Sequence, residues 1–116
     1  MQGIYFVNDR ISLNSFSKEE SLLLQEQNIL EHFHNHNIHI VKLNPYQLNE
    51  YYTIPHALLY DLKQEKAQFD YFIYYSPQVM EDFIYSYPAR WLMLKSYFNE
   101  IITIEERTDL IVKKVV

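Results

Sequence analysis

Cysteine is absent from this chain of 116 residues, and glycine occurs only once, at Gly3. Without cysteine the protein has no disulfide framework, thiol nucleophile or thiolate metal site, and this composition fits a cytoplasmic location. The phosphate-binding loops of P-loop and dinucleotide-binding proteins need several glycines, because the backbone must approach the ligand without an intervening Cβ atom. The sequence therefore excludes both of these nucleotide-binding motifs.

Positive charge is also scarce. The chain has 10 Lys and Arg side chains against 15 Asp and Glu, for a formal charge of −5. A protein that binds DNA through its phosphates needs a basic surface, and the local basic cluster here is only Lys113-Lys114, so the sequence argues against DNA binding. No uncharged apolar run approaches the roughly 20 residues of a membrane-spanning helix, and we expect no membrane partner.

Apolar and aromatic segments predict the fold. Residues 69–75 form a short run, Phe-Asp-Tyr-Phe-Ile-Tyr-Tyr, that is typical of a central strand buried on both faces. Further strands are expected at residues 3–7, 38–43, 101–104 and 110–116. Helices are expected at residues 17–35, 54–66 and from Ser76 onward, where Pro88 should kink or divide the helix. We predict a single domain over residues 1–116, of the three-layer α/β/α class with a mainly parallel four- to five-stranded sheet.

Helix-start signals and apolar stripes add detail to these helices. Ser17 and Glu20 form a capping box, and Thr53 and Ser76 are expected to cap the next two helices just before a proline. The side chains expected to face the core are Leu22, Leu23, Ile29, Leu30, Phe33, Leu58, Leu59 and Leu62. The segment from Trp91 to Phe98 is apolar on nearly all sides, so we expect it to be helical and packed on more than one face.

Several short motifs follow one another in an order found in a known family. They are Ile4-Tyr5, Ser21-Leu22-Leu23-Leu24-Gln25, Pro55-His56-Ala57-Leu58-Leu59 and Ser76-Pro77-Gln78-Val79-Met80-Glu81. In this order and spacing, residues 4–106 resemble the N-terminal catalytic domain of the serine recombinases, the resolvase and invertase group. The resemblance implies a resolvase-like fold, and it locates the positions at which that family carries its catalytic side chains.

The chain departs from this family at the catalytic positions. The nucleophilic serine of the family aligns with Asp9, and its arginines align with Val7, Ile54, Gln78 and Glu81. Attack on a phosphodiester needs a hydroxyl nucleophile and guanidinium groups that neutralise the phosphate. Neither is present at these positions, so the resemblance implies a pseudoenzyme with no catalytic residue and no cofactor.

Tyrosine is abundant, with 11 residues in the chain. Tyrosine is enriched at protein interfaces, but it also fills core edges with its hydroxyl in water, and the sequence leaves both interpretations open. We expect a protein-binding surface formed by Tyr85, Tyr87, Trp91, Tyr97 and Phe98, together with Tyr51 and Tyr52. The partner would be a second copy or a replication, recombination or regulatory protein, in a low-GC bacterium or its phage.

Polar clusters support alternative hypotheses. Asp9, Glu81 and Asp82 would cup Mg²⁺ in a small enzyme or a phospho-acceptor. His56 and Ser76 would act as base and nucleophile, although no oxyanion donor is visible and Ser76 is already explained as a cap. A histidine cluster has zinc-like spacing without an evident fourth ligand, and a favourable contact with the helix dipole explains it more simply. Its members are His32, His34, His36 and His39. Our preferred prediction is that the chain holds no metal.

Overall fold

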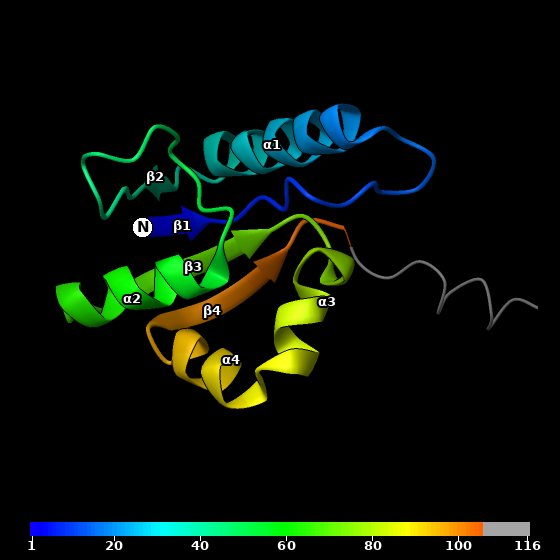
Figure 1. Cartoon of the computed structure of the whole chain (residues 1–116). Coiled ribbons are helices and arrows are strands. Elements are labelled where there is room, and N and C mark those ends of the chain that lie inside the picture. Colours follow the sequence, from blue (N-terminus) through cyan, green and yellow to red (C-terminus); the bar gives the residue numbers. More distant parts are fainter. Residues whose placement is uncertain (106–116) are drawn as a thin grey trace, which may run out of the picture.

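The computed structural model describes residues 1–105. The elements are β1 (Gln2–Tyr5), α1 (Lys18–Asn35), β2 (His39–Ile40), α2 (Pro55–Glu65), β3 (Phe69–Tyr74), α3 (Pro77–Ser86), α4 (Pro88–Lys95) and β4 (Phe98–Thr103) (Figure 1). The strand expected at residues 110–116, with Lys113 and Lys114, lies outside the described residues. Within them, no helix is long and apolar enough to cross a membrane.

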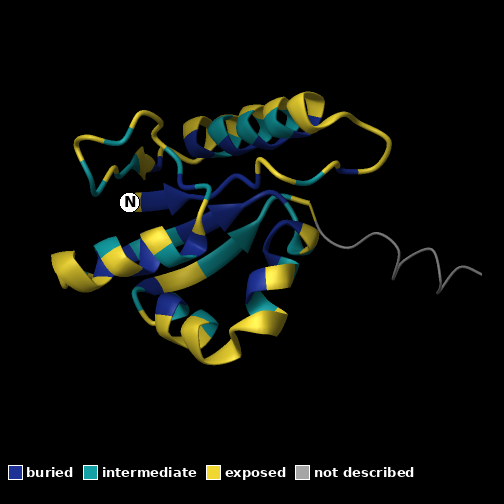
Figure 2. Ribbon diagram, viewed as in Figure 1, coloured by how far each residue is buried: buried dark blue, intermediate teal, exposed yellow. Residues whose placement is uncertain are grey.

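The sheet contains four strands in the order β2-β1-β3-β4, and every neighbouring pair is parallel. This confirms the predicted α/β class with a parallel sheet. β1 and β3 are the central strands, and Figure 2 shows both of them largely buried. The β1 and β3 registers align Ile4 with Phe72 and Tyr5 with Ile73, and these residues form the middle of the core.

Helices cover both faces of the sheet. The chain runs from β1 to β2 in one direction along the sheet, and from β2 to β3 and on to β4 in the opposite direction. Because crossovers between parallel strands are right-handed, connections that run in opposite directions lie on opposite faces of the sheet. Accordingly, α1 covers one face alone, and α2, α3 and α4 pack together on the other (Figure 1). This is the three-layer arrangement expected from the sequence.

The second strand is much shorter than expected, because another residue takes its place beside β1. β2 pairs only with Gln2 and Gly3. Directly after β1, Tyr52 pairs with Phe6: the Tyr52 N–H donates to Tyr5 O at 3.1 Å, and the Tyr52 carbonyl accepts from Val7 N at 2.9 Å. The expected strand over residues 38–43 is therefore limited to His39–Ile40.

The capping box of α1 is present as predicted, with Ser17 Oγ accepting from Glu20 N at 3.1 Å and Glu20 Oε1 accepting from Ser17 N at 2.9 Å. These hydrogen bonds hold the pKa of Glu20 below its usual value. The buried stripe differs from the expected one: Ser21 and Gln25 face the core beside Ile29 and Phe33, and Leu23 is 54% exposed. Polar side chains occupy the inward positions because they bind the loop that follows β1.

The helices of the other face follow the predicted proline signals. Leu58, Leu59 and Leu62 of α2 are buried as expected. The N-cap residue of α2 is Ile54, which makes no side-chain cap hydrogen bond, so the prediction that Thr53 caps this helix is wrong. Ser76 is the N-cap residue of α3, but its side chain makes no cap hydrogen bond either.

Pro88 divides the last helix into α3 and α4, as predicted. The second part ends at Lys95, so the expectation that Tyr97 and Phe98 are helical is wrong. Phe98 begins β4 instead, because its ring packs against Phe72 with centroids 5.2 Å apart. This contact places the start of the edge strand in the core.

Gly3, the one glycine of the chain, marks a close approach between β1 and the α1 layer. A Cβ atom at this position would lie 3.0 Å from Ile38 Cγ2 and 3.1 Å from Phe33 Cε2. Both neighbours belong to the buried core, so neither has open space to move into. Glycine is needed here for space between packed layers.

Gly3→Val should therefore lower the free energy of unfolding by about 1 to 3 kcal/mol through overpacking. Phe33→Leu, which relieves the clash, should cost at least about 0.5 kcal/mol less in the Gly3→Val background than in the native chain. Urea unfolding of the two single variants and the double variant measures this coupling. Strictly additive effects would show that Phe33 does not set the size of residue 3.

Candidate functional site

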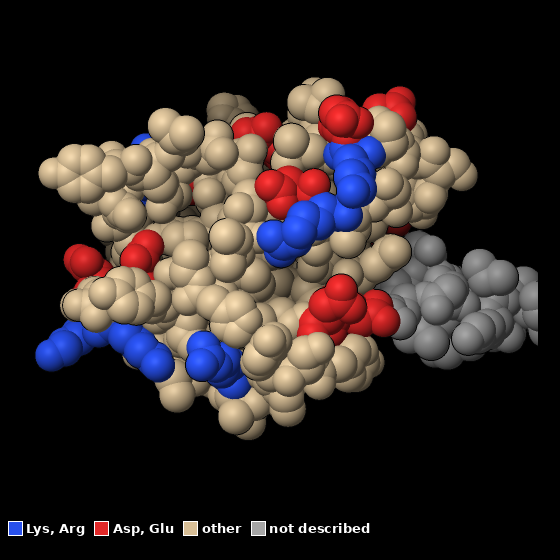
Figure 3. All heavy atoms as spheres, viewed as in Figure 1, with Lys and Arg blue, Asp and Glu red and all other residues tan. Residues whose placement is uncertain are grey.

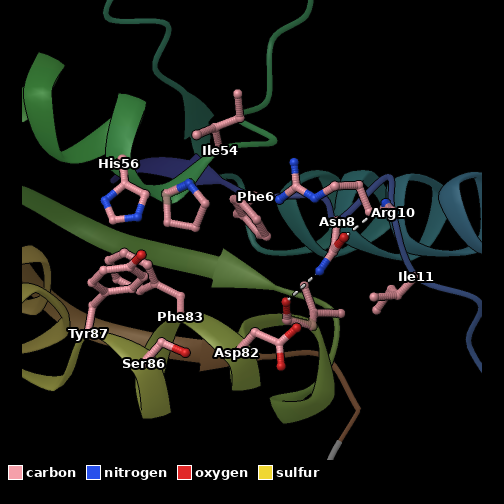
Figure 4. Close-up of a pocket in the computed structure, with 12 residues that line it drawn as sticks. Phe6, Asn8, Arg10, Ile11, Ile54, His56, Asp82, Phe83, Ser86 and Tyr87 are labelled. Atoms are coloured by element: carbon pink, nitrogen blue, oxygen red, sulfur yellow. Dashed lines mark hydrogen bonds between the residues drawn. The ribbon is translucent and has the colours of Figure 1, made fainter.

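A pocket of about 550 Å³ opens beside the carboxyl end of β1 (Figure 4). The chain leaves β1 toward β2 on one side and leaves β3 toward β4 on the other, and such a switch point is where parallel α/β sheets hold ligands. The pocket is lined by Phe6, Asn8, Arg10 and Ile11 after β1, by Ile54, Pro55 and His56 at the start of α2, and by Val79, Asp82, Phe83, Ser86 and Tyr87 of α3 and its end. The pocket therefore lies between the loop after β1, the start of α2 and one side of α3.

Asn8 fixes the floor of this pocket. Its backbone N–H donates to Gln25 Oε1 at 2.9 Å, and Gln25 Nε2 donates to the Asn8 carbonyl at 2.9 Å. The Asn8 amide then donates to Val79 O at 3.0 Å, while its Oδ1 accepts from Arg10 N at 3.0 Å. Because both ends of the amide are bonded and the residue is only 9% exposed, Asn8 holds the surrounding loops in place.

Ser21 completes this buried polar network. Its Oγ accepts from Gln25 Nε2 and from Leu13 N, each at 3.3 Å. Ser21 and Gln25 are fully buried, and all buried side-chain nitrogen and oxygen atoms of the described residues have partners. A satisfied network of this kind specifies one position for the β1 to α1 loop.

Arg10 brings a positive charge to the upper wall of the pocket. Its Nη2 donates to Thr53 O at 3.2 Å, and its Nη1 lies 3.9 Å from Asp9 Oδ1. The Arg10 and Asp9 side chains are 58% and 45% exposed, so their ion pair is weak. Arg10 was not identified from the sequence, since an arginine in a loop carries no periodic or spacing signal.

His56 and two aromatic rings form the far wall. The His56 ring meets Tyr87 edge-on at 4.6 Å and Phe83 at 5.2 Å between centroids. Arg90 Nη1 lies 3.2 Å from His56 Nδ1. Because a guanidinium only donates, His56 Nδ1 accepts this bond, and in the neutral ring the proton is on Nε2. Ser76 does not line the pocket, so the structure does not bring it to His56 there.

The positions that align with recombinase catalytic residues are scattered over different environments. Val7 is fully buried, Gln78 is exposed and Glu81 is partly buried. Ile54 is 48% exposed and lines the pocket, and Asp9 lies beside Arg10. Of these five, only Ile54 faces the pocket.

The expected metal-binding alternatives are not formed by the described residues. Within residues 1–105, no three or more His, Asp or Glu side chains are placed to hold a metal ion. Asp82 lines the pocket without Asp9 or Glu81.

The histidine cluster has a different arrangement. His32 and His36 stack at 4.1 Å between ring centroids, and His36 Nδ1 lies 3.0 Å from the His32 carbonyl oxygen. Partial burial and then the neighbouring His36 lower the pKa of His32, which favours its neutral form.

The residues predicted to bind a protein divide into exposed and packed ones. Tyr85 and Tyr87 are 75% and 46% exposed. Tyr52 and Phe98 are core residues at 5% and 6% exposed, which corrects their assignment to a contact surface. Trp91, Tyr97 and Tyr51 are partly buried against the core.

Tyr52 donates its hydroxyl to Asp61 Oδ2 at 2.6 Å. Burial of Tyr52, and then this contact with Asp61, raise the pKa of the Tyr52 hydroxyl.

Leu92 and Met93 join the exposed aromatic residues. They are 63% and 43% exposed on α4, and Figure 2 shows the corner between α3 and α4 as largely exposed. We name Tyr85, Tyr87, Leu92 and Met93 the α3–α4 surface. The sequence placed Leu92 and Met93 in a helix packed on several sides, but the short α4 buries only Leu94.

Gln25→Leu should leave the N–H and carbonyl of Asn8 without their buried partners, at a cost of about 2 to 4 kcal/mol in the free energy of unfolding. Gln27→Leu is the matched control, because Gln27 is exposed on the same helix and its replacement should change stability by less than about 0.5 kcal/mol. Urea unfolding followed by circular dichroism compares the two variants. Equal effects would show that the network around Asn8 contributes nothing specific.

Comparisons with known proteins assign no family to the chain. No family model matches the sequence, and neither a curated protein nor a solved structure is significantly similar to it. The likeness to serine recombinases therefore rests on the motifs quoted above.

Proposed function

We propose that the protein is a non-catalytic binding module of resolvase-like descent that contacts another protein through the α3–α4 surface. The observation that carries this proposal is the exposure of large apolar side chains on two helices that pack together, with Tyr85 of α3 at 75% and Leu92 of α4 at 63%. Isolated exposed apolar residues are common on soluble proteins, but a cluster on neighbouring elements is typical of an interaction site. Tyrosine and methionine are also enriched at such sites.

The absence of a catalytic arrangement at the aligned positions supports the same proposal. A recombinase would need a hydroxyl nucleophile where Asp9 lies and guanidinium groups where Val7 and Gln78 lie. The buried Val7 side chain has no access to a substrate, and Asp9 has a carboxylate in place of the serine hydroxyl of the family. These substitutions favour a pseudoenzyme over an enzyme.

Surface charge supports a protein partner over DNA. On the face shown in Figure 3, most side chains are uncharged, and the charged ones form small separate groups of both signs. A phosphate backbone is bound by a continuous basic surface, which this face does not offer. The partner we propose is a second copy of the chain or a cytoplasmic replication, recombination or regulatory protein of a low-GC bacterium or its phage.

Leu92→Ser should weaken partner binding at least about tenfold, because a large exposed apolar contact is lost. Leu23→Ser is the matched control: Leu23 is 54% exposed on α1, on the opposite layer. Two measurements cover the two partner classes, namely sedimentation velocity over a concentration series and quantitative affinity capture from the cells that make the protein. A monomer at every concentration, together with identical capture by both variants, would contradict the proposal.

The alternative, a Mg²⁺ site at Asp9, Glu81 and Asp82, makes a different prediction. Because these carboxylates do not converge in the described structure, a Mg²⁺ titration should leave their backbone amide NMR signals unshifted. Asp9→Asn is the control that removes the central carboxylate. Saturable shifts in the native chain that disappear in Asp9→Asn would favour the alternative.

A further inference from the structure

We infer that the pocket beside β1 binds a small organic anion with a flat apolar body, such as an aryl carboxylate or a nucleoside monophosphate. This site is separate from the α3–α4 surface except at Tyr87, which belongs to both. Its volume of about 550 Å³ is within the range of pockets that enclose small ligands. Most of its lining is apolar or aromatic, with a few polar groups, as such sites require.

Arg10 is the group that would bind the negative charge. Figure 4 shows its guanidinium on the same wall as Ile54 and Phe6. Only Nη2 makes a hydrogen bond, to Thr53 O at 3.2 Å, and the nearest carboxylate oxygen is 3.9 Å from Nη1. The planar guanidinium has further N–H groups, in the geometry that matches a carboxylate or phosphate.

The start of α2 adds to the attraction for an anion. Ile54, Pro55 and His56 all line the pocket, and they are the N-cap and first residues of this helix. The Ile54 carbonyl accepts from Ala57 N and Leu58 N, but the first turn contains no acidic residue, so no negative side chain of this turn offsets the positive end of the helix. The His56 ring contributes an Nε2–H donor, because its Nδ1 accepts from Arg90.

The aromatic side chains that line the pocket favour a ligand with a flat apolar body. Phe83 and Tyr87 present their rings within 4.6 to 5.2 Å of His56, and Phe6 lies on the adjacent wall. These contacts already fix the His56 ring at 89° to Tyr87, so the wall is formed before a ligand arrives. A planar ring would gain contact with these side chains at little entropic cost.

Asp82 limits the number of negative charges that the ligand can carry, and it determines the orientation of the ligand in the pocket. It lies with Ser86 on the wall formed by α3, and Figure 4 shows both across the pocket from Arg10. An anion must therefore point toward Arg10, and the other end of the ligand must be neutral or carry hydrogen-bond donors. A second negative charge would face the Asp82 carboxylate, which disfavours diphosphates.

An amide-resolved NMR titration of the full chain tests this inference with naphthoate and adenosine monophosphate as probes. Naphthamide and adenosine are the matched neutral controls. We expect at least one of the two anions to shift the amides of Asn8, Arg10, His56 and Phe83 saturably, with a Kd below about 1 mM. Its neutral counterpart should bind at least about tenfold more weakly. The two anions distinguish a carboxylate ligand from a phosphate ligand.

Variants identify the groups responsible. Arg10→Gln should weaken anion binding at least about fivefold, Arg10→Lys should weaken it less, and Asp82→Asn should strengthen it. Lys63→Gln is the charge-matched control, since Lys63 lies near the other end of α2. Leu92→Ser should leave anion binding unchanged, which separates this inference from the proposed protein contact. No saturable shift with either anion, equal binding of the neutral controls, or equal effects of Arg10→Gln and Lys63→Gln would overturn it.

Discussion

The hydrogen bonds of Asn8 determine the geometry of the whole carboxyl edge of the sheet. This one residue connects the end of β1 to Gln25 of α1 on one face and to Val79 of α3 on the other. The buried amide groups have no access to water, so each bond must be made within the protein for the fold to be stable. As a result, the loop that carries Asp9 and Arg10 leaves the sheet in one direction, with Arg10 beside the pocket.

On the face of the sheet opposite α1, Pro88 determines where α3 ends and α4 begins. By ending α3 and restarting the chain as α4, it creates a corner at which α4 is too short to bury more than Leu94 fully. The apolar residues that remain outside form the α3–α4 surface, and Tyr87 at the junction also closes the pocket against His56. The pocket and the proposed protein contact therefore meet at Tyr87, the residue at which the helix is divided.

Local signals in the sequence were sufficient for the fold class and for most helix boundaries. The Ser17 capping box and the prolines at positions 55, 77 and 88 each act within one helical turn, which is why they could be recognised. The length of β2 was not predictable, because Tyr52 takes the pairing edge of β1 from a distant part of the chain. Leu23 was misplaced for a related reason: Gln25 faces inward because it bonds Asn8, and Ser21 faces inward because it bonds Gln25 and Leu13. Asn8 and Arg10 line the pocket through loop geometry that no periodicity in the sequence encodes.

The central claim is that the α3–α4 surface contacts another protein, and photo-crosslinking in the cells that make the protein tests it most directly. A photoreactive phenylalanine derivative in place of Tyr85, which is 75% exposed, should give covalent adducts of defined mass after irradiation. The same residue in place of Leu23, which is 54% exposed on the other layer, should give none. Adducts from neither position, or equal adducts from both, would contradict the account.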